Sequence, residues 1–141
     1  MDEILTNMIS GQTKRPQEYS PLVLAYVGDA VYEAYVRTHL VKGGNIPVHR
    51  LHRMSTRLVS AKAQSDIVEA LLATLDEEEI RIYKRGRNAK AATTPKNADL
   101  NDYRRATGFE ALVGYLYLAG RFGRLEEILE LAVHEREGEE K

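Results

Sequence analysis

Two acidic residues are conspicuous because each lies in a long stretch of otherwise apolar side chains. Within residues 21–36 the only charged side chains are Asp29 and Glu33. Within residues 106–120 the only Asp, Glu, Lys or Arg is Glu110. An ionised carboxylate is costly to bury unless it is paired, protonated or bound to a metal ion. The two stretches therefore predict a buried acidic site whose charge something must compensate.

The two acids are expected to meet if their helices pack together, since Gly28 and Gly114 would let the backbones approach closely. Two facing carboxylates repel, and a hard divalent cation is the natural occupant. Mg²⁺ fits because it accepts few protein ligands and keeps waters and substrate phosphates. The alternative is that Asp29 pairs with an arginine while Glu110 reaches solvent. Glu33, one helical turn from Asp29, is either a further ligand or a surface residue.

Basic residues suggest what such a site would act on. The net charge of −1 conceals seven acids in residues 126–141, and residues 1–125 hold 18 Lys and Arg against 14 Asp and Glu. Residues 80–98 carry six basic side chains and no acid. Such a run can bind a polyanion by displacing its counterions, or it can be a solvated face. The candidate contacts for such a polyanion are Arg50, Arg53, Arg57, Lys62, Arg85, Arg87, Lys90 and Lys96.

Helical patterns account for the elements that must position the first acid and the basic residues. Ser20 and Pro21 predict the start of a long helix that carries Asp29 and ends before two glycines at 43 and 44. Apolar residues between positions 51 and 71 recur at helical spacing, with a break expected near Ser55. Residues 74–79 predict another helix start, in which Asp76 and Glu79 form a capping box.

The second acid belongs to a helix near the end of the chain. Residues 86–101 lack an apolar period and predict a long basic surface loop. Asn101 or Asp102 is expected to cap the next helix, which contains Glu110 and ends at Gly120, and a last helix begins at about Phe122. We therefore expect one all-α domain over residues 1–141, with an N-terminal segment at 1–19 and an acidic tail at 134–141.

Composition excludes several classes of protein. The chain has no cysteine, which removes disulfides, thiolate zinc sites and cysteine nucleophiles. The N-terminus has acids near its start and no signal-peptide core, and no stretch approaches the roughly 20 apolar residues of a membrane span. These features predict a soluble, cytoplasmic protein with no membrane partner.

Two motifs resemble those of the ribonuclease III family. Residues 24–36, LAYVGDAVYEAYV, are similar to its signature helix, and residues 107–118, TGFEALVGYLYL, are similar to its second acidic motif. Asp29 and Glu110 fall on catalytic acids of the family, whereas Ala25 and Thr107 stand where the family pattern has further acids. These departures, together with residues 83–90, YKRGRNAK, resemble the Mini-III branch of the family.

This resemblance implies a helical bundle like the ribonuclease III catalytic domain. It also implies a cytoplasmic bacterial homodimer that cuts double-stranded RNA with Mg²⁺ and matures precursor large-subunit (23S) ribosomal RNA. The missing acids at Ala25 and Thr107 make one metal ion the safer expectation. They also keep an alternative open, which is a catalytically inactive domain that binds RNA or the ribosome. A helical protein-interaction module is a third possibility.

Overall fold

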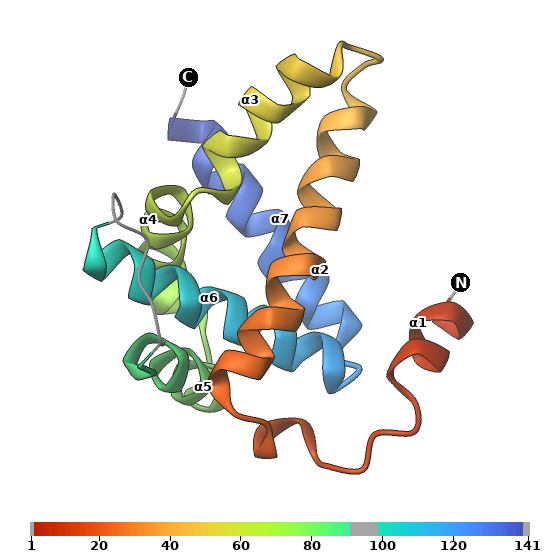
Figure 1. Ribbon diagram of the computed structural model, residues 1–141, viewed down its shortest axis with the longest axis vertical. Helices are drawn as coiled ribbons and strands as arrows, with labels where there is room; N and C mark the ends of the chain where they lie inside the picture. Colours follow the sequence, from red (N-terminus) through yellow and green to blue (C-terminus); the bar gives the residue numbers. More distant parts are fainter. Residues whose placement is uncertain (1, 91–98, 140–141) are drawn as a thin grey trace.

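The computed structural model describes residues 2–90 and 99–139, which form seven α-helices, two short 3-10 helices and no strand (Figure 1). The prediction of an all-α fold is confirmed. In chain order the elements are α1 (Asp2–Ile9), η1 (Pro16–Glu18), α2 (Pro21–Lys42), α3 (Val48–Val59), α4 (Ala61–Leu71), η2 (Leu72–Thr74), α5 (Glu77–Asn88), α6 (Leu100–Leu118) and α7 (Phe122–Glu139). None of these helices is long and apolar enough to span a bilayer.

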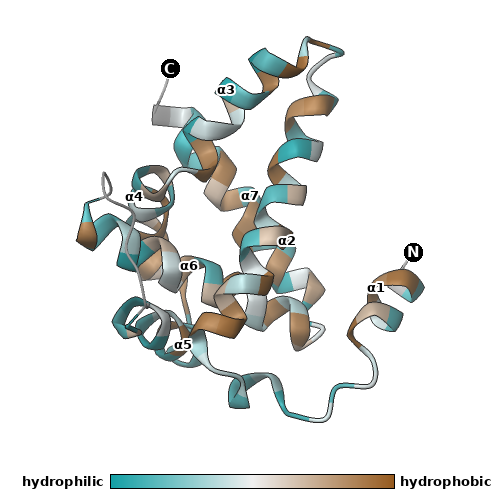
Figure 2. Ribbon diagram, in the orientation of Figure 1, coloured by the Kyte–Doolittle hydropathy of each residue, from teal (hydrophilic) through white to brown (hydrophobic). Residues whose placement is uncertain are grey.

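Helix α6 lies at the centre of the fold and packs against α2, α4, α5 and α7. Between positions 106 and 116 every residue of α6 is buried except Glu110, which is half-buried. Figure 2 shows α2, α6 and α7 with long hydrophobic stretches, whereas α3 and α5 are largely hydrophilic. Because α6 is surrounded on most sides, Glu110 is carried partly into the interior of the domain.

The crossing of α2 and α6 is a direct contact between their backbones. A Cβ atom added at Gly28 would lie 1.7 Å from the Glu110 carbonyl oxygen, and one added at Gly114 would lie 1.9 Å from the Leu24 carbonyl oxygen. No side chain fits at either position. The predicted close approach at these two glycines is confirmed, and it brings the helices of the two acids together.

A second crossing of this kind joins α5 to α6, and the sequence analysis did not foresee it. A Cβ atom at Gly86 would lie 2.9 Å from the Gly108 Cα atom, and one at Gly108 would lie 2.7 Å from the Tyr83 carbonyl oxygen. The prediction placed Gly86 in a loop, but α5 continues to Asn88. Helix α6 is therefore approached closely by a second helix.

Two of the expected helix starts are formed as predicted. The Ser20 hydroxyl accepts a hydrogen bond from the Val23 amide at the start of α2. At the start of α5, the Asp76 side chain accepts from the Glu79 amide while the Glu79 side chain accepts from the Asp76 amide. These caps satisfy amide groups that have no partner within their helices.

Several boundaries differ from the prediction. The break in the second helical stretch falls at Ser60, which ends α3 and caps α4, and not near Ser55. Helix α6 begins earlier than expected, because Asp99 and not Asn101 or Asp102 caps it. The predicted loop at 86–101 is shorter at both ends, and its middle, with Lys96, lies outside the described residues. Most of the predicted acidic tail is helical, since α7 continues to residue 139.

A buried ion pair connects α5 to α7. The Glu79 side chain has no solvent exposure, and its two oxygens accept hydrogen bonds from the Nε and Nη2 atoms of Arg124, each at 2.8 Å. Arg124 also donates to the Thr74 carbonyl oxygen at 2.7 Å. This bidentate contact holds the pKa of Glu79 below its usual value, chiefly through hydrogen bonding to Arg124.

Candidate active site

The side chains of Asp29 and Glu110 meet where α2 crosses α6. A protonated Glu110 carboxyl is within reach to donate a hydrogen bond to Asp29. Asp29 is exposed, so the prediction that it is buried is wrong: α2 turns its Gly28 face to α6 and Asp29 lies at the edge of that contact. Glu110 is the acid that the fold removes from water.

Burial and the neighbouring charge act on Glu110 in the same direction. Desolvation is the larger cause and the negative charge of Asp29 the next, and together they raise the pKa of Glu110 to about 8. No lysine, arginine or histidine forms an ion pair with either carboxylate anywhere in residues 2–90 and 99–139. The alternative in which an arginine neutralises Asp29 is therefore not observed.

Glu33 stands apart from this acid pair. Its carboxylate accepts a hydrogen bond from the Arg37 Nε atom at 3.1 Å, one helical turn further along α2. In the described part of the chain no group of three or more His, Asp or Glu side chains is placed to share a metal ion. The acidic site therefore consists of two carboxylates, and Glu33 acts on Glu110 only through its charge.

Gln64 of α4 is a contact of the acid pair that the sequence analysis missed. Its side-chain amide nitrogen donates to the Glu110 Oε2 atom at 3.3 Å and to the Val59 carbonyl oxygen at 2.9 Å. A glutamine cannot titrate, so a search for ionisable residues passes over it. Its spacing could have indicated that it is buried. Gln64 lies three residues before Ile67 and seven residues before Leu71, on the buried face of α4.

Three of the predicted RNA contacts form a stripe along α3. Arg50, Arg53 and Arg57 are exposed and line a groove of about 370 Å³ with Met54. None of the three arginines forms an ion pair with another described residue. Their charges are therefore available to an anionic ligand.

The remaining predicted contacts have different surroundings. Lys62 pairs with Asp66 at 3.1 Å. Arg85 donates to the carbonyl oxygens of residues 17 and 19, each at 3.1 Å, and so ties the segment before α2 to α5. The Arg87 guanidinium stacks 5.7 Å from the centre of the Tyr83 ring, and Lys90 is exposed just after α5.

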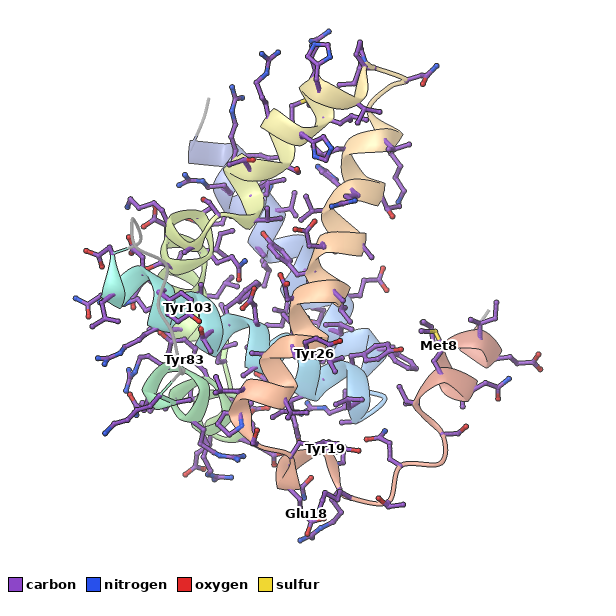
Figure 3. The ribbon with its side chains drawn as sticks, viewed as in Figure 1. Met8, Glu18, Tyr19, Tyr26, Tyr83 and Tyr103 are labelled. Carbon is purple, nitrogen blue, oxygen red and sulfur yellow. The ribbon has the colours of Figure 1, made fainter. Side chains whose placement is uncertain are left out.

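An apolar hollow of about 1090 Å³ opens beside Asp29, between α1, α2 and α7. Figure 3 labels Met8 of α1 and Tyr26 of α2, which belong to its walls. Tyr26 is 81% exposed although it lies in the middle of α2. The hollow is lined mainly by Leu5, Met8, Tyr26, Val27, Ala30, Val31, Ala34, Tyr35, Tyr117, Phe122, Leu125 and Leu129.

Comparison with known proteins agrees with this helical fold. The family model described as the ribonuclease III domain matches residues 22–121, which include both acids and the helices from α2 to α6 but not α7. The match covers more than half of the chain, and it defines the class of protein as an endoribonuclease with a ribonuclease III domain.

Individual relatives indicate the branch of the ribonuclease III family to which the chain belongs. A Mini-ribonuclease 3 of Brevibacillus brevis is 50% identical over 90% of this chain and 95% of its own length. A Mini-ribonuclease 3 of Thermoanaerobacter is 56% identical over 81% of this chain and 80% of its own. The crystal structure of a Fusobacterium nucleatum protein superimposes with a TM-score of 0.74 at 34% identity, covering 86% and 97% of the two chains. The chain belongs to the Mini-ribonuclease 3 branch of the ribonuclease III family.

Proposed function

We propose that this endoribonuclease cleaves double-stranded RNA with Mg²⁺, which Asp29 and Glu110 hold directly or through water. The acid pair carries the proposal, because two carboxylates meet with no basic partner among the described residues. Such a pair fits Mg²⁺, which takes one or two carboxylates and completes its coordination with water and substrate phosphate. When bound, the ion supplies Lewis-acid chemistry for phosphodiester hydrolysis and offsets charge on the leaving oxygen.

The experiment compares duplex RNA with its separated strands, in Mg²⁺ and in a chelator. We expect cleavage of the duplex only, in Mg²⁺ only, with 5′-phosphate and 3′-hydroxyl ends. Duplex RNA that is bound but not cut would support the alternative of an RNA- or ribosome-binding domain. RNA that is neither bound nor cut would support a protein-interaction module.

The arginine stripe of α3 is the surface that we propose for the phosphates of the duplex, with Arg87, Lys90 and Lys96 as further contacts. Duplex RNA is recognised largely by shape, phosphates and 2′-hydroxyls, so little sequence preference is expected. Because the groups that Arg85 contacts are carbonyl oxygens of the chain itself, its larger role is to hold the N-terminal segment.

Salt dependence tests this surface. Replacing Arg50, Arg53 and Arg57 with alanine should make the slope of log affinity against log salt shallower, by roughly 0.9 per lost phosphate contact if the B-DNA value applies. Lys62→Ala is the matched control, since Asp66 already pairs with that lysine. An unchanged slope in the triple variant would place the RNA elsewhere.

A homodimer is the assembly that we propose, with the apolar hollow and the exposed face of α2 as its interface. Large apolar side chains on this side are left in water in the single chain, among them Met8, Leu22, Val23 and Tyr26, which are 65%, 38%, 46% and 81% exposed. An exposed apolar area of this kind commonly marks an interface. A symmetric pair would use the same surface twice and supply one acid site per strand of a duplex.

Light scattering tests the assembly, and about twice the chain mass of 15.9 kDa is expected. Tyr26→Asp should give a helical monomer, because it puts a charge on the proposed interface. Tyr103→Asp, in α6 at the left of Figure 3 and away from Met8 at the right, is a control that should remain dimeric. A wild-type monomer in dilute solution would contradict the proposal.

The natural substrate that we propose is precursor 23S ribosomal RNA, which places the enzyme in the bacterial cytoplasm. The relatives named Mini-ribonuclease 3 support this proposal only by resemblance. Depletion of the protein in its own host should cause precursors with unprocessed 23S ends to accumulate. Mature ends at normal levels would contradict it.

A further inference from the structure

Gln64 is a buried polar side chain beside the acid pair, with only 2% of its surface exposed. Its amide nitrogen has two acceptors, the Val59 carbonyl oxygen at 2.9 Å and the Glu110 Oε2 atom at 3.3 Å. Its Oε1 atom is buried and has no partner among the described residues. Burying an amide with half of its hydrogen-bonding capacity unused costs free energy, so the position calls for an explanation.

The surroundings of Gln64 require an amide at this position. Both neighbours are acceptors, so only the NH₂ group can face them, and this fixes which side of the amide is nitrogen. A glutamate would present oxygen to oxygen, and an apolar side chain would leave the Glu110 carboxylate without its donor. The contact to Val59 anchors the amide to the backbone where α3 ends.

We propose that Gln64 is a positioning residue of the active site, whose anchored amide holds the Glu110 carboxylate beside Asp29 in the arrangement that binds the metal ion. The inference rests on the proposed metal-dependent function and goes beyond it, since Gln64 is not itself a ligand. Groups that hold a metal ligand in place typically contribute about 10- to 100-fold to metal affinity or activity.

Gln12 provides a matched control. Its amide nitrogen also donates to two acceptors, the carbonyl oxygens of Ile9 at 2.8 Å and Leu118 at 2.9 Å, but neither belongs to an acid. Gln12→Met therefore removes the same two amide donations, and also the Oε1 acceptor of the Tyr19 hydroxyl, from a glutamine that has no contact with Glu110. Any effect that is confined to Gln64→Met must come from the acid site.

The experiment measures Mn²⁺ binding without RNA by electron paramagnetic resonance, and then kcat and KM for duplex RNA. We expect Gln64→Met and Gln64→Glu to bind Mn²⁺ about 10- to 100-fold more weakly than the wild type. At limiting Mg²⁺ their kcat should fall while KM for RNA is unchanged, and added Mg²⁺ should restore kcat in Gln64→Met. Gln12→Met should match the wild type in metal binding.

Three results would overturn the proposal. Wild-type Mn²⁺ affinity in Gln64→Met with only a lower melting temperature, or failure of that variant to fold, would assign Gln64 to stability alone. Tighter binding in Gln64→Glu would make the position a ligand site. The wild-type protein tests the proposed function separately. If the wild type binds no Mn²⁺ and cleaves RNA in a chelator, the proposed metal-dependent function is wrong.

Discussion

Glu79 and Glu110 are two glutamates that the fold takes out of water in opposite ways. Glu79 is fully buried against Arg124, which bonds both of its oxygens, and its pKa is lowered. Glu110 faces the negative charge of Asp29 and one neutral amide, and its pKa is raised to about 8. The first acid is compensated by the protein, whereas the second has no basic partner among the described residues, and we propose that a metal ion compensates it. This difference separates a structural acid from a chemical one.

The largest expected effect comes from removing charge at the acid pair. Asp29→Asn and Glu110→Gln should each reduce cleavage to background while RNA binding and the helical circular dichroism spectrum remain. Mg²⁺ at 100 times its Kd stabilises a protein that binds it by about 2.7 kcal/mol, which raises the melting temperature. Both variants should lose this rise in melting temperature with Mg²⁺. Glu33→Gln is the control, since Glu33 pairs with Arg37 outside the site. Near-normal cleavage by either variant would refute the role of that residue.

The structural acid should respond in stability and not in chemistry. Arg124→Met removes the guanidinium that bonds both oxygens of the buried Glu79 and leaves it the Asp76 amide and Arg121 at 3.9 Å. It should lower the free energy of unfolding by about 3 kcal/mol, measured by urea denaturation. Cleavage per folded molecule should be unchanged. The double variant with Glu79→Gln should recover part of the loss, because no buried charge then remains. A loss well below 1 kcal/mol in Arg124→Met would mean that water reaches Glu79.

A change in the backbone contact between α2 and α6 should affect both the stability of the fold and the acid pair. Gly28→Ala would place a Cβ atom 1.7 Å from the Glu110 carbonyl oxygen, so α2 and α6 must separate. We expect a loss of about 2 kcal/mol in stability together with weaker metal binding. Gly123→Ala has no atom within 4 Å of its added Cβ and should change neither. Wild-type metal binding in Gly28→Ala would show that the acids do not depend on this crossing.

The two glutamates should also give opposite dependences of stability on pH. In metal-free protein at pH values between about 4.5 and about 8, Glu110 keeps a proton that the unfolded chain has released. Its contribution to the free energy of unfolding therefore falls as pH rises through this range. Glu79 stabilises above its unfolded pKa, and this contribution is lost as pH falls through its lowered folded pKa. The difference in the free energy of unfolding between wild type and Glu110→Gln should change by at most about 1.4 kcal/mol per pH unit. A flat difference between pH 5 and 8 would contradict the raised pKa.

Local sequence chemistry predicted the helical class, the capping box at Asp76 and Glu79, and the close approach of the acid-bearing helices. Local sequence patterns do not predict which residues distant in the sequence come into contact. Nothing near Glu79 in the sequence indicates that Arg124, 45 residues away, completes its hydrogen bonds. Gln64 was missed for the same reason, because its role depends on which carboxylate α6 brings beside it.

The two serines at the α3–α4 break show why boundaries were harder to predict. The Ser55 hydroxyl donates to the His52 carbonyl oxygen of the preceding turn, so the helix continues past it. The Ser60 hydroxyl accepts from the Ala63 amide of the following turn, so a new helix begins there. The same residue type continues one helix and starts another, and the choice depends on how the flanking helices pack.

The glycine contact between α2 and α6 also sets when the proposed acid site can form during synthesis. The two acids are separated by about 80 residues of sequence, so the site cannot close until most of the chain has been made. At about 5 to 20 residues per second, α2 waits on the order of 4 to 16 s for α6 to be made. A nascent chain that lacks α6 lacks Glu110 and therefore the proposed acid site. A chain still on the ribosome cannot cut RNA through this site until its central helix has been added.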